Sequence, residues 1–172
     1  MDGFIIFIDN GVSGTIGMRS TSGICEFFEV PTYTEQYYTK AKKNINLLDV
    51  DRIRSMINDL RDRFPDSWIR VYMERPMVNA TRFFASVSAV VCHYMYVQIF
   101  KDLKVPYEIV DSKEWQKEML PHGIKGSAEQ KKASMDAGLR LFPQFEKLIR
   151  KHKDADGILG AEFFYRRNNR TV

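Results

Sequence analysis

Apolar residues gather in short continuous runs along this chain, and a carboxylate directly follows two of these runs. Residues 4–8 are followed by Asp9 and a turn that contains Gly11 and Gly14, and residues 68–73 are followed by Glu74. Uninterrupted apolar runs of this length are typical of strands that are buried on both faces. Because an unpaired buried charge is costly, we expect each carboxylate where its strand ends and a cleft begins.

The rest of the pattern predicts further strands at 15–20, 23–30 and 107–110. Helices are expected at 49–63, 80–101, 127–141 and from 154 onward. The side of the second helix that suits packing against a sheet is small and apolar, and consists of Ala85, Val87, Ser88, Val91, Met95 and Ile99. The polar and aromatic segment 31–48 is expected to be a connection that lies on the surface.

This order of elements predicts an α/β fold with a five-stranded mixed sheet, in which the first three strands are antiparallel and helices cover both faces. The strands at 4–8 and 68–73 can lie side by side and parallel, joined by a right-handed crossover. Their carboxyl ends then coincide, so Asp9 is expected next to Glu74. A third carboxylate, Asp156, lies in the first turn of the last predicted helix and could complete the group.

Length and composition place limits on the class of protein. The 172 residues predict a single domain, 1–172, with a short basic tail at about 166–172. A net charge of +4 and a pI of about 9.0 fit nucleic-acid binding without requiring it. Cys25 and Cys92 form neither a disulfide framework nor a zinc pattern, which predicts a reducing, cytoplasmic location. We expect no signal peptide, no membrane-spanning segment and therefore no membrane partner.

Grouped carboxylates have a definite chemistry. They repel one another unless a cation lies between them, and oxygen ligands suit Mg²⁺ or Mn²⁺ better than zinc. Paired metal ions at such sites cleave phosphodiesters. Each residue also has an ordinary interpretation: Asp9 as a turn residue, Glu74 as an ion-pair partner of Arg75, Asp154 as a helix cap, and Asp156 as a favourable charge at a helix N-terminus.

Four segments in order give the chain a family resemblance. Segment 8–11 contains an Asp-x-Gly motif after the first strand, and segment 71–76 contains the Glu that ends the fourth strand. Segment 126–134 is a basic helix start, and segment 155–161 begins with an Ala-Asp motif. Together they resemble the motifs of the RuvC family of Holliday-junction resolvases, and most of all its phage and prophage branch. The resemblance covers nearly the whole chain and implies a ribonuclease-H-like fold.

The resemblance also implies roles for individual residues. It assigns Asp9, Glu74 and Asp156 as ligands of Mg²⁺, for which Mn²⁺ is expected to substitute. It places Lys131 near the active site, where its charge would stabilise charge that builds up on the phosphate.

The fourth metal position departs from the family pattern. The family has an acidic or His ligand one helical turn before the last Asp, and the residue three positions before it here is Lys153, which cannot bind a metal while protonated. We expect His152, four positions before, to take this place ahead of Asp154, with water as a third option. His152 is also a candidate general base, since its pKa is near neutrality.

Contacts to DNA are expected from residues around these motifs. Lys125 and Lys132 flank the start of helix 127–141, and Lys151 and Lys153 belong to a basic run before the last motif. Basic residues beside a nuclease centre supply sequence-independent affinity for phosphates. Met77 stands where cellular members often have an aromatic residue that stacks at the junction centre, so the step that opens the junction is expected to differ here.

The sequence therefore predicts a crossover junction endodeoxyribonuclease that resolves four-way DNA junctions by paired symmetric nicks. Two nicks need two active sites, which implies a homodimer, with the apolar side of helix 80–101 as its interface. Such an enzyme would act in DNA recombination and repair in a bacterial or phage-infected cell. One alternative is a nuclease of the same fold for other branched DNA or RNA–DNA hybrids, and another is a non-catalytic DNA-binding scaffold.

Overall fold

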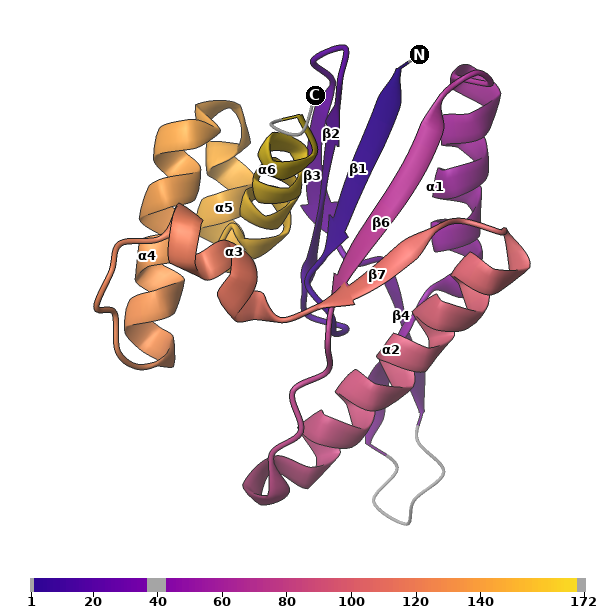
Figure 1. Cartoon of the computed structure of the whole chain (residues 1–172). Coiled ribbons are helices and arrows are strands. Elements are labelled where there is room, and N and C mark those ends of the chain that lie inside the picture. Colours follow the sequence, from indigo (N-terminus) through magenta and orange to yellow (C-terminus); the bar gives the residue numbers. More distant parts are fainter. Residues whose placement is uncertain (1, 37–42, 170–172) are drawn as a thin grey trace.

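A central five-stranded sheet organises the protein, as seen in a computed structural model that describes residues 2–36 and 43–169 (Figure 1). The strand order is β3-β2-β1-β6-β7. The antiparallel strands are β1 (Gly3–Ile8), β2 (Thr15–Ser20) and β3 (Cys25–Glu29), whereas β6 (Trp68–Glu74) and β7 (Tyr107–Val110) continue the sheet parallel to β1. The predicted mixed sheet is confirmed.

Helices cover both faces of this sheet (Figure 1). One face carries α1 (Val50–Arg63) and α2 (Phe83–Asp102), which follows a single 3₁₀ turn, η1 (Ala80–Arg82). The other face carries α3 (Ser112–Met119), α4 (Ser127–Leu141), the 3₁₀ turn η2 (Pro143–Phe145), α5 (Glu146–His152) and α6 (Asp156–Asn169). The layered arrangement predicted from the sequence is therefore present.

Strand β1 supplies side chains to both cores, which explains its uninterrupted apolar sequence. Phe4, Ile6 and Ile8 pack in the core under α1 and α2. Ile5 and Phe7 point the opposite way, into the core under α3 to α6. Because successive side chains of a strand alternate between faces, a strand covered on both sides needs an apolar residue at every position.

Helix α6 lies directly against β2 because glycines line the contact. A Cβ atom added to Gly17 would lie only 2.2 Å from the carbonyl oxygen of Gly157. The Gly157 N–H donates to Thr15 Oγ1 at 3.0 Å, and both residues are buried. This contact fixes the first turn of α6, and with it Asp156, over the start of β2.

The segment 31–48 contains a hairpin that the sequence did not predict. Strands β4 (Thr32–Gln36) and β5 (Asn44–Leu48) pair antiparallel, and residues 37–42 lie outside the described residues. Every residue of β4 is exposed, and in β5 only Leu48 is fully buried, so the hairpin offers little buried surface from which to predict it. The expected surface position holds for β4, whereas the two strands themselves were not predicted.

Two short helices were also missed. Helix α3 has only two fully buried residues, Trp115 and Met119, and α5 has only Ile149. A helix with so few buried residues lacks the repeated apolar stripe on which a sequence prediction depends. A capping box identifies the start of α3, since the side chain of Asp111 accepts a bond from a first-turn N–H and Glu114 reciprocates.

Helix α2 is present as predicted, but its core-facing side was assigned wrongly. The buried residues are Ser86, Cys92, His93, Tyr96, Ile99 and Phe100. Of the six positions predicted to face the sheet, Ala85, Val87 and Val91 are exposed and only Ile99 is fully buried. Apolar residues occur all around this helix, and its first turns extend beyond the strands (Figure 1), so no single stripe marks the core side.

The same helix corrects the expectation that no segment could span a membrane. In the described part of the chain, the segment Ala80–Asp102 is long enough and apolar enough to do so by length and composition alone. Helices of soluble proteins also meet these two criteria, so the finding is weak evidence of a membrane span. It does identify α2 as an apolar helix of which little is buried.

Candidate active site

Asp9 and Glu74 lie at the ends of neighbouring parallel strands. Strand β1 pairs with β6 up to Ile8 opposite Met73, so Asp9 and Glu74 are the next residues on each strand. The Asp9 N–H donates to the Thr15 carbonyl at 3.0 Å, which closes a tight turn between β1 and β2. The predicted neighbourhood of the two carboxylates is therefore confirmed.

A buried tryptophan fixes the orientation of Glu74. Trp115 of α3 is completely buried, and its Nε1–H donates to Glu74 Oε1 at 2.7 Å. This bond occupies one carboxylate oxygen and leaves the other available to a ligand. Nothing in the local sequence links Trp115 to a residue 41 positions away, so this contact could not be predicted.

A serine on α4 holds the segment that enters α6. Ser134 is buried, accepts a hydrogen bond from the Ala155 N–H at 2.9 Å and donates one to Asp156 Oδ1 at 2.5 Å. One hydroxyl thus fixes both the backbone before Asp156 and the side chain of Asp156 itself. Its position three residues after Lys131, on the same face of the helix, is the sequence signal that could have identified it.

Asp154 joins the group from the turn between α5 and α6. Helix α6 begins at Asp156, and its first backbone bond runs from the Leu159 N–H to the Ala155 carbonyl, so Asp154 is not the helix cap that the sequence allowed. The Asp154 side chain is buried, and its Oδ2 lies 3.6 Å from Lys131 Nζ. The structure therefore turns Asp154 toward the predicted active-site lysine.

The electrostatics demonstrate that these carboxylates act on one another. Burial raises the pKa of Asp9 well above its ordinary value, and the charges of Glu74, Asp156 and Asp154 raise it further, whereas Lys131 lowers it. Burial is also the main cause that raises the pKa of Glu74 to about 7 and that of Asp156 to about 6. Mutual repulsion of this kind is relieved when a cation binds between the groups.

The donor set fits a hard divalent cation. All four groups are carboxylates, the ligands that Mg²⁺ and Mn²⁺ prefer, and the buried Oδ1 of Asp154 has no hydrogen-bond partner within the described residues. In the same part of the chain, no three Asp, Glu, His or Cys side chains stand close enough to hold one ion as they are oriented. Binding of one ion by all four carboxylates would therefore require a rotation of side chains.

His152 is occupied elsewhere. Its Nε2 lies 2.7 Å from Oε1 of Glu29 on β3, and Lys151 forms an ion pair with the same carboxylate. Lys153 adopts a left-handed conformation with φ of 62°, which ends α5 and separates it from the turn that carries Asp154. The structure brings Asp154 to the other carboxylates and places His152 with Glu29, the reverse of the order expected from the sequence.

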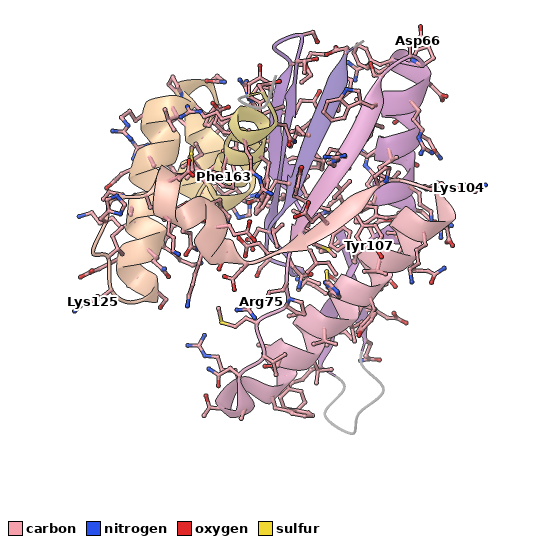
Figure 2. The ribbon with its side chains drawn as sticks, in the orientation of Figure 1. Asp66, Arg75, Lys104, Tyr107, Lys125 and Phe163 are labelled. Carbon is pink, nitrogen blue, oxygen red and sulfur yellow. The ribbon has the colours of Figure 1, made fainter. Side chains whose placement is uncertain are left out.

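The remaining predicted DNA contacts are spread over the surface. Lys125 lies in the loop before α4, on the outside of the helical layer (Figure 2). Lys132 lines a hollow between α4 and that loop, away from Lys131. Met77 is 79% exposed in the segment that joins β6 to α2. Of the predicted basic residues, Lys131 is the one that the structure brings to the carboxylates.

The similarity of this chain to known proteins lies in structure and not in sequence. No model of a known protein family matches, and no curated protein matches either. Solved structures that resemble the chain include Thermus thermophilus RuvC, with a TM-score of 0.48, 14% identity and coverage of 96% of both chains. The T. thermophilus RuvC in complex with a Holliday junction substrate gives a TM-score of 0.46 and 15% identity, again over 96% of both chains.

The arrangement of the strands then decides the fold. The chain has a ribonuclease-H-like fold. Its three antiparallel strands, two further parallel strands and helices on both faces form the mixed sheet that the family resemblance implied.

The raised pKa values predict how the stability of the metal-free protein depends on pH. The folded state favours the protonated forms of Asp9, Glu74 and Asp156, whereas in the unfolded chain these groups ionise near pH 4. Their stabilising contribution is complete below pH 4 and is lost as the pH rises to about 7.

We therefore expect the melting temperature in EDTA to fall between about pH 5 and pH 8 by more in the wild type than in Asp9→Asn. With the variant as the reference, the contribution of carboxylates elsewhere in the protein to the pH dependence of the melting temperature cancels. Mg²⁺ should raise the wild-type melting temperature most at the alkaline end. Identical pH profiles for the two proteins would show that Asp9 is not in a repelling group.

Proposed function

We propose that this protein is a metal-dependent, structure-selective endodeoxyribonuclease that resolves four-way DNA junctions by paired nicks. The observation that carries the proposal is the group of Asp9, Glu74, Asp154 and Asp156 at one edge of the sheet, in which burial and mutual repulsion raise the pKa values of three members. The sequence resemblance to RuvC resolvases supports the choice of substrate.

Each residue has a part in this proposal. Asp9, Glu74 and Asp156 would hold Mg²⁺, and Asp154 is proposed as the fourth ligand in place of His152. Bound metal would supply an activated water and neutralise the leaving oxygen of a phosphodiester. Trp115 and Ser134 orient two of the ligands through hydrogen bonds. Such supporting bonds tune ligand geometry and metal affinity.

Lys131 is proposed to contact the phosphate that is cut. Its side chain is 63% exposed, while its Nζ stays 3.6 Å from buried Asp154. An ammonium group at the mouth of an acidic site attracts the DNA backbone and stabilises negative charge in the transition state. Lys151 and Lys153 are exposed at the end of α5, where they are proposed to extend this contact along the backbone.

We propose that a two-fold homodimer forms through the exposed apolar side of α2. Phe83, Phe84 and Tyr94 are each exposed by 66% or more, and Val87 and Val91 by 44%. Large exposed apolar patches mark interaction sites, and a two-fold dimer would supply the two active sites that paired nicks require.

Val91→Glu should convert this dimer to a monomer, because the interface would have to bury an unpaired charge. We expect self-association to weaken by about tenfold or more, as measured by sedimentation velocity. Ile109→Glu is the matched control, since Ile109 is an apolar residue of β7 with 48% exposure and lies outside α2. This interface would be contradicted if the wild-type protein is a monomer, or if it binds lipid vesicles through α2.

The experiment that tests the function compares substrates at physiological salt. Labelled four-way junction, replication fork, flap, linear duplex and RNA–DNA hybrid are each incubated with the protein, with and without Mg²⁺. We expect tighter binding and faster cleavage of the junction than of the duplex. Equal cleavage of hybrid and junction would favour the broader nuclease, and junction binding without cleavage at any metal concentration would favour a scaffold.

A further inference from the structure

Helix α2 is bonded to the turn that carries Asp9. The side-chain amide of Asn10 donates from Nδ2 to the carbonyl oxygen of Ala89 at 3.1 Å. In addition, the backbone N–H of Gly11 lies close enough to the sulfur of Cys92, which is 1% exposed, to lower the pKa of that thiol, although burial raises this pKa overall to about 11. The two residues after Asp9 therefore both lie against the middle of α2, far away in the sequence, and Asn10 is hydrogen-bonded to it.

These anchors share one face of the helix. Ala89, Cys92 and Tyr96 are spaced by three and four residues, so they lie above one another on the same side. The Tyr96 hydroxyl is buried close to the same site. Burial is the main cause that raises the pKa of Tyr96, followed by Cys92 and then by the charge of Asp9. The side of α2 that is fixed to the active-site turn is thus distinct from the exposed side around Val91.

Asn10 makes this contact with part of its own side chain unsatisfied. Its Oδ1 is buried and has no hydrogen-bond partner among the residues that the structure describes. A buried amide oxygen without a partner is destabilising, and such groups in native proteins call for an explanation other than stability. The position of the Asn10 amide directly next to Asp9 supplies such an explanation.

We propose that Asn10 is a positioning residue whose amide anchors the Asp9 turn to helix α2 and thereby sets the affinity of the carboxylate group for a divalent metal ion. It does not touch the metal or the substrate. The inference rests on the proposed function only in that the carboxylates bind metal. Loss of the anchor would let Asp9 move, while the strands and both cores keep their contacts.

Metal binding itself provides the test. We expect Asn10→Ala to bind Mn²⁺ about 10- to 100-fold more weakly than the wild type in calorimetry, the range typical of lost supporting bonds around a metal site. The matched control is Asn168→Ala. The side-chain amide of Asn168 also donates a hydrogen bond between two elements, to the Tyr72 hydroxyl at 3.0 Å. This bond lies at the end of α6 that is remote from Asp156. The affinity of Asn168→Ala for Mn²⁺ should equal that of the wild type.

The outcomes separate the two proposals. Mn²⁺ binding by Asn10→Ala that equals the wild type, or an equal loss in both variants, would overturn the role of Asn10. A wild type that binds Mn²⁺ yet cleaves no DNA would refute the nuclease, while the comparison of affinities still decides the role of Asn10. A wild type that binds no Mn²⁺ would overturn both. If cleavage occurs, excess Mn²⁺ should restore the turnover of Asn10→Ala, because the ligands themselves are intact.

Discussion

Asp9→Asn, Glu74→Gln and Asp156→Asn are each expected to lower the rate of junction cleavage by about a thousandfold or more, which corresponds to roughly 4 kcal/mol of transition-state stabilisation. Each substitution keeps the shape of the side chain and removes the charge that would hold the metal. Binding of DNA should not weaken, because the substituted groups are acidic and repel phosphate. The measurements are single-turnover cleavage and junction binding for each variant.

The same three substitutions should keep or raise the melting temperature of the metal-free protein. Burial and repulsion make the ionised carboxylates unfavourable in the fold, so neutral amides relieve a cost rather than create one. This combination of lost activity with retained stability distinguishes a metal site from a structural role. Asp66→Asn is the matched control, since Asp66 is exposed near the opposite end of the sheet from Arg75 (Figure 2). Near-normal cleavage by any of the three variants would remove that residue from the site.

Asp154→Asn is expected to reduce cleavage by about a hundredfold, whereas His152→Ala should have little effect. Asp154 is buried beside Lys131 with one oxygen unpartnered among the described residues, and repulsion from its charge acts on both Asp9 and Asp156. His152 instead contacts Glu29, in a partly buried pair that involves none of the four carboxylates.

These two variants control for each other, because the residues are only two positions apart, on either side of the end of α5. Single-turnover cleavage across a range of Mg²⁺ concentrations should show a raised metal requirement for Asp154→Asn alone. If His152→Ala loses more activity than Asp154→Asn, then His152 leaves Glu29 when substrate binds, and the assignment of the fourth ligand to Asp154 is wrong.

The strands and the first two carboxylates could be predicted because their signals are local. A run such as 4–8 that is apolar at every position has to lie between two cores, and an Asp directly after it has to reach the edge of the sheet. The parallel crossover between β1 and β6 then determines that Glu74 lies beside Asp9. Each step uses residues that are neighbours in sequence or a general rule of chain topology.

The fourth ligand could not be predicted in the same way. Counting three or four residues back from Asp156 assumes one continuous helix. Lys153 breaks that assumption with a left-handed conformation, which no pattern of apolar residues reveals. The contacts of Trp115 with Glu74 and of Ser134 with Asp156 join distant segments, so they also become visible only in the folded chain.

The core-facing side of α2 was assigned wrongly for a different reason. Apolar side chains surround this helix, and the sequence alone does not tell which of them face the sheet. The structure separates a face that holds the Asp9 turn, through Ala89 and Cys92, from a face with Val87 and Val91 that no described segment covers. The proposed dimer and the proposed role of Asn10 depend on this separation.

Cleavage of a supercoiled plasmid that extrudes a cruciform tests the central claim most directly. A dimer with two metal centres should cut both strands at the cruciform within one binding event, so linear plasmid should form without accumulation of nicked circles. The reaction should require Mg²⁺ or Mn²⁺ and should be absent with Asp156→Asn. A plasmid that stays supercoiled at every metal concentration, or that is nicked at random without regard to the cruciform, would contradict the account.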